Sequence, residues 1–158
     1  MSSYDVILHP TDFSEDSDLA FQLACSIARD QFASVVVVHV LPPEFCPDGQ
    51  SNDVALDTDL PMVRDCHDNF CRMKAQAGDL PISFRIVRGY SVGAILNVAH
   101  EENADLMVIA SHQHTRFHLQ VHGSVAEGLL RQSHCPLMVL RHPVPNIARR
   151  TLPIDTTK

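Results

Sequence analysis

Val35-Val-Val-Val-His-Val-Leu41 is an unbroken run of mainly β-branched residues, and this run decides the fold. A strand with one face in water would alternate apolar and polar residues, so an unbroken run indicates that both faces are covered. Strands of this kind belong to parallel sheets, whose crossover connections place helices on both faces. The run therefore predicts a central strand of an α/β domain.

The segments on either side of this run alternate between short apolar stretches and helical periodicity. Further strands are expected at residues 6–8, 82–87, 106–110 and 136–140. Helices are expected to begin after Ser14, at Pro61, after Ser91 and at Ser124. We therefore expect an α/β fold with an open five-stranded, mostly parallel sheet that is flanked by four helices.

The first helix has a clear start signal and a clear apolar face. Ser14 can cap it, and acidic residues follow in the first turn, where the helix dipole favours negative charge. Leu19, Leu23 and Ile27, together with Ala20, Ala24 and Ala28, recur at helical spacing. This spacing predicts that these side chains form the apolar face of the helix.

Composition and charge narrow the class of protein. The chain has 158 residues, enough for one domain with a sizeable core, and a formal net charge of −7. This charge argues against a general nucleic-acid binder, which needs clustered Lys and Arg. The apolar runs are far too short to span a bilayer, and the first residues do not resemble a signal peptide. We expect one domain over residues 1–141, a proline-containing tail over 142–158, and no membrane partner.

The cysteines indicate in which cellular compartment the protein works. The chain has Cys25, Cys46, Cys66, Cys71 and Cys135. Their odd number and scattered spacing do not predict a disulfide framework. Cys25 and Cys135 lie in apolar runs, as small buried residues do. These features favour a reducing, cytoplasmic location.

Three strands are followed by loops that can meet in space. Pro10-Thr11-Asp12 follows the first strand, the second ends near Val40, and residues 110–125 follow the fourth. In parallel sheets ligands bind outside the carboxyl ends of the strands, where the strand order reverses. Gly123-Ser124 opens a helix with Glu127 completing a capping box, and the free N–H groups of a helix start suit a phosphate. The loops therefore predict one binding crevice with an anion site.

Taken together, these segments resemble the universal stress protein family. The resemblance covers about residues 4 to 141 and rests on five stretches: Val6-Ile-Leu-His-Pro-Thr-Asp-Phe-Ser14, Val38-His-Val40, Asp105-Leu-Met-Val-Ile109, Gly123-Ser-Val-Ala-Glu127 and Cys135-Pro-Leu-Met-Val-Leu-Arg141. It implies the family's Rossmann-like fold and a cytoplasmic, stress-response regulatory protein rather than an enzyme. It also implies a homodimer, because the strand from Leu137 to Leu140 resembles the strand through which the family dimerises.

The resemblance further implies a site for an adenine nucleotide. The nucleotide-binding branch of the family carries the motif G-x-x-G-x9-G-[ST]. Its last two positions match Gly123 and Ser124, whereas the first two fall on Ala110 and Gln113. The implied ligand is ATP, or alternatively AMP or ADP, together with Mg²⁺. Because the motif keeps only its second half, the start of the loop, at Ala110 and Gln113, is where nucleotide binding could be lost.

Matching the family residue by residue gives a set of expected contacts. The resemblance places the adenine near Val40 and the ribose near Asp12. It places the phosphates near the backbone of His112, Gly123, Ser124 and Val125. The whole expected nucleotide site consists of Pro10, Thr11, Asp12, Val40, Ile109, Ala110, His112, Gln113, Gly123, Ser124 and Val125.

Other interpretations of the same residues stay open. Ser124 can be a plain helix cap and Asp12 a plain turn residue, which would leave a nucleotide-free dimeric interaction module. The loop histidines, His112, His114, His118 and His122, would suit a metal-responsive protein, since zinc favours imidazole ligands. No Cys, Asp or Glu lies in that loop, so solvated histidines are the preferred interpretation. The sequence shows neither a Ser–His–Asp order, nor paired carboxylates, nor a Walker-type lysine, so no enzyme is predicted.

Overall fold

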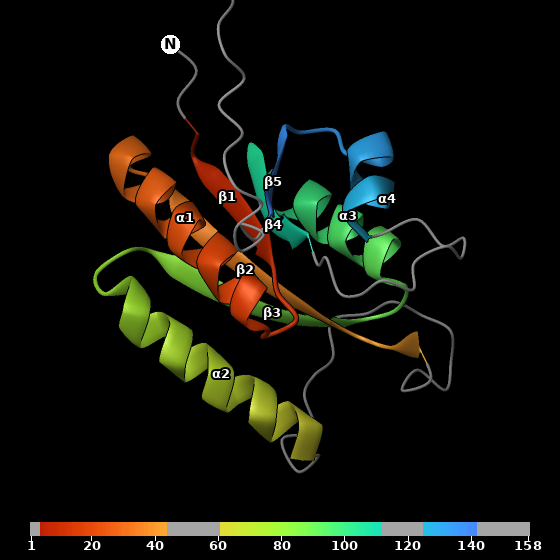
Figure 1. Cartoon of the computed structure of the whole chain (residues 1–158), viewed down its shortest axis with the longest axis horizontal. Helices are drawn as coiled ribbons and strands as arrows, with labels where there is room; N and C mark the ends of the chain where they lie inside the picture. The colour runs from red at the N-terminus through yellow and green to blue at the C-terminus, as the bar shows by residue number, and fades with distance from the viewer. Residues whose placement is uncertain (1–3, 44–60, 112–124, 142–158) are drawn as a thin grey trace, which may run out of the picture.

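The computed structural model describes residues 4–43, 61–111 and 125–141 (Figure 1). Within these ranges strands and helices alternate along the chain. The elements are β1 (Val6–Pro10), α1 (Glu15–Gln31), β2 (Ser34–Leu41), α2 (Pro61–Ala77), β3 (Ile82–Arg88), α3 (Ser91–Glu101), β4 (Leu106–Ser111), α4 (Val125–Gln132) and β5 (Leu137–Arg141). Residues 112–124 and the proposed tail at 142–158 lie outside the described residues.

The strands form one five-stranded sheet with the order β3-β2-β1-β4-β5. Every neighbouring pair of strands is parallel. The predicted fold class is therefore confirmed. The chain adds strands on one side of β1 as far as β3 and then crosses to β4 on the other side. The order reverses between β1 and β4, which is where such sheets bind ligands.

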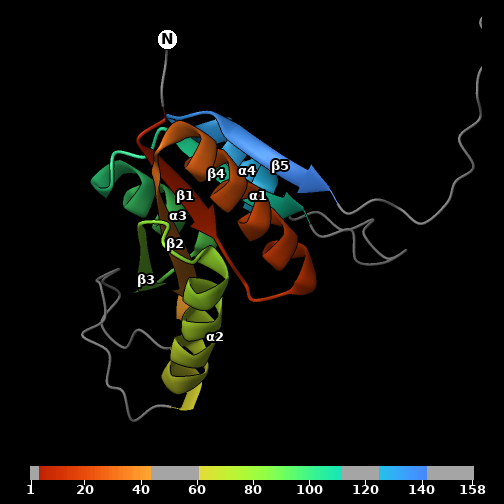
Figure 2. The same ribbon diagram turned by 90° about the vertical axis from the view of Figure 1, so that its left-hand side faces the viewer.

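Helices cover both faces of the sheet, as Figures 1 and 2 show. On one face α1 and α2 pack against Ile7, Val35 and Val37. On the other face α3 and α4 pack against Leu8, Val36 and Val38. Neighbouring strand residues point to opposite faces, so the unbroken valine run supplies both cores. Burying one such side chain contributes roughly 1.5–3 kcal/mol, which explains the lack of polar residues in this run.

Helix α1 begins where the sequence predicts, and most of its predicted apolar face meets the core. Ser14 is its N-cap and accepts a hydrogen bond from the Ser17 backbone N–H. The prediction that Leu19 lies on this face is wrong, because its side chain is 39% exposed. The predicted Ala20, Ala24 and Ala28 are buried, together with Ser17, Phe21 and Cys25, and Leu23 and Ile27 pack at the edge of the core. The small residues let the helix approach the sheet closely, and Phe21 fills the core.

Strand β1 extends further than the sequence predicts. The sequence predicts a strand over residues 6–8, yet the strand also includes His9 and Pro10, and Pro10 is paired with Val38 of β2. The next backbone N–H, that of Thr11, donates to the Val38 carbonyl at 2.9 Å. Successive N–H groups of a strand point to opposite sides, so the N–H that Pro10 lacks would face β4. The pairing with β4 reaches only Leu8, so the proline interrupts no bond there.

Candidate functional site

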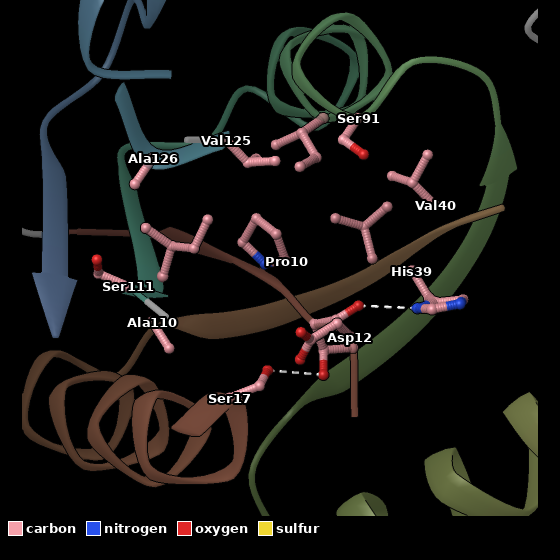
Figure 3. Close-up of a pocket in the computed structure, with 14 residues that line it drawn as sticks. Pro10, Asp12, Ser17, His39, Val40, Ser91, Ala110, Ser111, Val125 and Ala126 are labelled. Atoms are coloured by element: carbon pink, nitrogen blue, oxygen red, sulfur yellow. Dashed lines mark hydrogen bonds between the residues drawn. The ribbon is translucent and has the colours of Figure 1, made fainter. Parts of the chain in front are cut away.

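A cavity of about 210 Å³ lies at the point where the strand order reverses (Figure 3). It is bounded by the carboxyl ends of β1, β2 and β4 and by the first residues of α3 and α4. Its lining consists of Pro10, Thr11, Asp12, Ser17, Val38, His39, Val40, Ser91, Ile95, Ile109, Ala110, Ser111, Val125 and Ala126. The chain thus brings together residues that lie more than a hundred positions apart.

Many of the residues expected at a nucleotide site do line this cavity. They are Pro10, Thr11, Asp12, Val40, Ile109, Ala110 and Val125. The remaining expected residues, His112, Gln113, Gly123 and Ser124, lie outside the described residues. The histidines of the proposed metal loop, His114, His118 and His122, lie outside them as well.

Sequence reasoning missed the other half of the lining. The missed residues are Ser17, Val38, His39, Ser91, Ile95, Ser111 and Ala126. Strand alternation could have revealed Val38, because it shares a sheet face with Val40. Ser91 could have been found because ligands bind at the carboxyl ends of parallel strands, and Ser91 follows β3 as Asp12 follows β1. Ser17 and Ile95 are placed by helix packing, and no local pattern indicates them.

One wall of the cavity is an apolar slot. It is lined by Val38 and Val40 of β2, Ile95 of α3, Ile109 of β4 and Pro10 of β1; Figure 3 shows Pro10 and Val40 among these residues. These side chains belong to the core between the sheet and α3, at the place where that core opens to the surface. A slot with such walls favours a flat, weakly polar ring system, because binding removes apolar surface on both sides of the ring from water.

Asp12 lies at the mouth of the cavity, in a turn that its own side chain closes. Its Oδ1 accepts a hydrogen bond from the Ser14 backbone N–H at 3.0 Å. Thr11 Oγ1 accepts one from the Phe13 backbone N–H at 3.0 Å. Both bonds are side-chain turns of the kind that Asp and Thr form. The Asp12 side chain is exposed, and a carboxylate is an acceptor for the hydroxyl groups of a ligand.

The backbone of this turn is held in an unusual conformation. Phe13 has φ 62, in the left-handed region that a bulky residue rarely occupies. Its ring stacks on His39 with the centroids 4.5 Å apart and meets Phe70 of α2 edge-on at 5.5 Å. His39 Nδ1–H also donates to the Thr11 carbonyl oxygen at 2.8 Å. Packing from β2 and α2 therefore offsets the backbone strain and fixes the Asp12 turn.

The two histidines below the turn are held in the neutral form. His9 is fully buried, and burial lowers its pKa to about 4, although its bond to Val108 and the charge of Asp12 act in the opposite direction. Burial also lowers the pKa of His39, against the effects of its bond to Thr11 and of the Asp12 charge. Near neutral pH neither His9 nor His39 therefore adds a positive charge beside Asp12.

His9 anchors a small buried network beneath the cavity. Its Nδ1–H donates to the Val108 carbonyl oxygen at 2.9 Å, and its Nε2 lies 3.4 Å from Ser17 Oγ. The Ser17 hydroxyl gives its one hydrogen to the shorter bond, to Thr11 Oγ1 at 2.8 Å. This network ties β1, β4 and α1 together and orients the Thr11 hydroxyl at the cavity wall.

Two helices begin at the opposite side of the cavity. In Figure 3, Ser91 of α3 lies there together with Val125 and Ala126 of α4, across from Asp12 and Ser17. Tyr90, the N-cap of α3, makes no side-chain capping bond. Unpaired N–H groups and the positive end of the helix dipole make such positions favourable for an anionic group. The cavity thus joins an apolar slot to a carboxylate on one side and to helix starts on the other.

The described residues supply little for other kinds of site. Among residues 4–43, 61–111 and 125–141, no group of three or more His, Cys, Asp or Glu side chains could hold a metal ion. The cysteines in these ranges, Cys25, Cys66, Cys71 and Cys135, are free thiols. No helix in the described part of the chain is both long and apolar enough to cross a membrane.

A family model and the curated relatives of this chain point to the same protein family. The universal stress protein family model matches residues 3–141. Universal stress protein MJ0531 of Methanocaldococcus jannaschii is 27% identical over 143 residues, which are 89% of this chain and 84% of the relative.

Solved structures share the fold. A universal stress protein crystallised in complex with cAMP matches with a TM-score of 0.66 at 25% identity, over 89% of this chain and 98% of that one. Protein MJ0577 of Methanocaldococcus jannaschii matches with a TM-score of 0.71 at 22% identity, over 90% of this chain and 99% of that one. These likenesses agree with the parallel α/β architecture described above.

Proposed function

The chain belongs to the universal stress protein family, and on this premise we propose that it binds an adenine nucleotide in the cavity between β1, β2 and β4. The observation that carries the proposal is the apolar slot between the Asp12 carboxylate and the first residue of α4, Val125. A nucleotide has the matching order of groups, namely a flat base, a sugar with hydroxyls and an anionic tail. The universal stress protein solved with cAMP supports the choice of an adenine ligand.

The proposed orientation follows from the chemistry of the lining. The adenine ring lies in the slot beside Val40, and the ribose hydroxyls donate to the Asp12 carboxylate. The phosphates lie at the start of α4, which Gly123 and Ser124 precede in the sequence. The ligand is ATP, AMP or ADP. When a polyphosphate is bound, Mg²⁺ neutralises part of its charge.

The site favours binding over catalysis. Asp12 has its Oδ1 bonded to a backbone N–H, and the buried imidazole of His9 bonds to a main-chain carbonyl rather than facing a ligand. Both are positioning roles. We therefore infer a cytoplasmic stress-response regulatory protein in which nucleotide occupancy is the signal, and not a dedicated enzyme.

We also propose that the protein is a homodimer that pairs through β5. This strand forms one edge of the sheet, and its Met138 and Val139 side chains are 40% and 37% exposed. An apolar edge strand left open would pair with other chains nonspecifically. Pairing with the same strand of a second copy satisfies its free backbone groups and covers these side chains.

Isothermal titration of the untagged protein with Mg-ATP, AMP and ADP tests the nucleotide proposal. Asp12→Asn keeps the oxygen that accepts from Ser14 N–H but removes the charge that receives the ribose hydroxyls. We expect it to weaken binding about tenfold or more, since hydrogen bonds to charged groups contribute about 1.5–3 kcal/mol. Asp30→Asn makes the same charge change at the exposed end of α1 and should leave the affinity unchanged.

Two results would count against this site. If no nucleotide gives heat or raises the melting temperature at millimolar concentration, the nucleotide-free interaction module becomes the better account of the chain. If Asp12→Asn and Asp30→Asn bind with the same affinity as the unaltered protein, a nucleotide binds elsewhere.

A further inference from the structure

Two histidines from different elements meet on the surface, away from the cavity. His100 lies in the last turn of α3, and His134 lies between α4 and β5. Their ring centroids are 5.6 Å apart and their planes are nearly perpendicular, at 88°. Both side chains are exposed. Ser91, at the cavity, begins the same helix, so His100 lies about 14 Å further along the helix axis.

The backbone on both sides of this pair is firmly bonded. Beyond His100, the Glu102 N–H donates to the Val98 carbonyl and the Ala104 N–H to the Ala99 carbonyl, each at 2.9 Å. Beside His134, the Ser133 N–H donates to the Leu129 carbonyl at 2.8 Å. The Ser133 hydroxyl also donates to the Cys135 carbonyl at 2.8 Å. The two imidazoles are thus presented by fixed backbone, which lowers the entropy cost of holding a shared ligand.

The separation of the rings matches that of two imidazoles on one metal ion. A metal–nitrogen distance of about 2.0–2.1 Å and a tetrahedral angle place two ring centroids about 5.3 Å apart. The observed centroid distance of 5.6 Å is close to this value, and the two nearly perpendicular rings must turn about their side-chain torsions to aim one nitrogen of each at a shared ion. His100 also lies at the carboxyl end of α3, where the helix dipole favours positive charge.

We propose that His100 and His134 form a two-histidine site for a divalent transition-metal ion. Imidazole nitrogen selects Cu²⁺, Ni²⁺ and Zn²⁺ over Mg²⁺ and Ca²⁺, and the affinity order places Cu²⁺ first. Water completes the coordination, because no third His, Cys, Asp or Glu joins the pair within the described ranges.

The surrounding charged groups are already engaged. Glu101 and Glu102 bind Arg85 at 2.8 and 2.9 Å, and Glu127 binds Arg131 at 2.9 Å. The Cys135 thiol lies 3.5 Å from the Ser133 hydroxyl and packs against the core of the α3 face. The pair is therefore an exposed, exchangeable site, unlike the closed four-ligand sites that stabilise folds.

Calorimetric titration of the untagged protein with CuCl₂, NiCl₂ and ZnCl₂ tests the site. We expect His100→Gln and His134→Gln each to weaken one binding event about tenfold or more, because losing either ring ends the chelate effect. In the double variant the loss of affinity should be smaller than the sum of the two single losses, as a shared ligand requires. His67→Gln removes an exposed histidine of α2 and is the matched control, expected to bind like the unaltered protein.

Nuclear magnetic resonance locates the ion independently of the other histidines. Cu²⁺ is paramagnetic, so substoichiometric addition should broaden the amide signals of Glu101, Ser133 and Cys135 first. His134→Gln should abolish that broadening. The proposal is overturned if both single variants bind all three ions with unchanged affinity, or if Cu²⁺ broadens only signals remote from His100 and His134.

Discussion

His9 is a fully buried imidazole, and its position makes the stability of the fold sensitive to acid. In the folded chain the pKa of His9 is about 4, against 6.5 for an ordinary histidine. Below pH 6.5 the unfolded chain therefore takes up a proton that the folded chain refuses. Stability from this group is complete above pH 6.5 and is lost as the pH falls toward 4.

We expect this loss to amount to about 3 kcal/mol, since one pKa unit corresponds to about 1.4 kcal/mol. His9→Gln keeps a donor for the Val108 carbonyl but cannot take up the proton. Urea unfolding at about pH 7 and about pH 4.5 should thus show a smaller difference in the free energy of unfolding for His9→Gln than for the unaltered protein. The exposed His67→Gln should keep the full difference. An equal pH dependence in His9→Gln and the unaltered protein would contradict the role of His9.

At the scale of elements, α3 and α4 approach each other through a glycine. A Cβ atom added to Gly128 would lie 2.7 Å from Val92 Cγ2, closer than such atoms can come. Alanine would favour the helix by about 1 kcal/mol, but forcing two helices apart costs about 1–3 kcal/mol. The steric cost decides the sign, because the branched Val92 side chain cannot swing away as a flexible chain could.

We therefore expect Gly128→Ala to lower the free energy of unfolding by about 1 kcal/mol. In the background of Val92→Ala the same change should be neutral or stabilising, because the clash is gone and the helical preference of alanine remains. Denaturant unfolding of the two single variants and the double variant measures this coupling. Additive effects in that cycle would show that the contact between α3 and α4 is not tight.

The elements also show what sequence can and cannot reveal. Val35 to Val38 identified a strand covered on both faces because four successive residues there are apolar, whichever face each one points to. The face of α1 was predicted except at Leu19, because the alanines and Phe21 form the close contact with the sheet and leave Leu19 at its exposed margin. Asp12 and Val40 could be predicted at the cavity because the carboxyl ends of parallel strands lie together at one edge of the sheet. Ser17 was missed because only the packing of α1 against β1 brings its hydroxyl beneath Thr11.

On the scale of the whole molecule, the two edges of the sheet differ in character. The described part of β3, at one edge, has no large apolar side chain that is exposed, whereas β5 exposes Met138 and Val139. This asymmetry gives the protein one apolar edge that can pair and one that is not suited to pairing. It is the structural reason for proposing a dimer rather than an open chain of subunits.

Val139→Lys places a charge on the exposed side of β5 and should weaken the dimer. We expect the monomer–dimer dissociation constant to rise about tenfold or more, since the charge would be buried without a partner. Light scattering over a range of protein concentrations measures the change. Phe32→Lys is the control, since Phe32 is 97% exposed at the end of α1 and belongs to no strand. A monomeric unaltered protein, or a Val139→Lys variant that dimerises as tightly, would rule out the β5 interface.

The pairing of β1 with β4 sets the time at which the cavity can form during synthesis. The Asp5 and Val6 backbone N–H groups donate to the Asp105 carboxylate, about a hundred positions further along the chain. A ribosome adding about 5–20 residues each second needs roughly 5–20 s to make that stretch. Until then the first strand has no partner on that side, and the floor of the cavity is incomplete. A small ligand that binds in this cavity can therefore stabilise the folding chain only late in translation. Before that, β1 can pair only with β2.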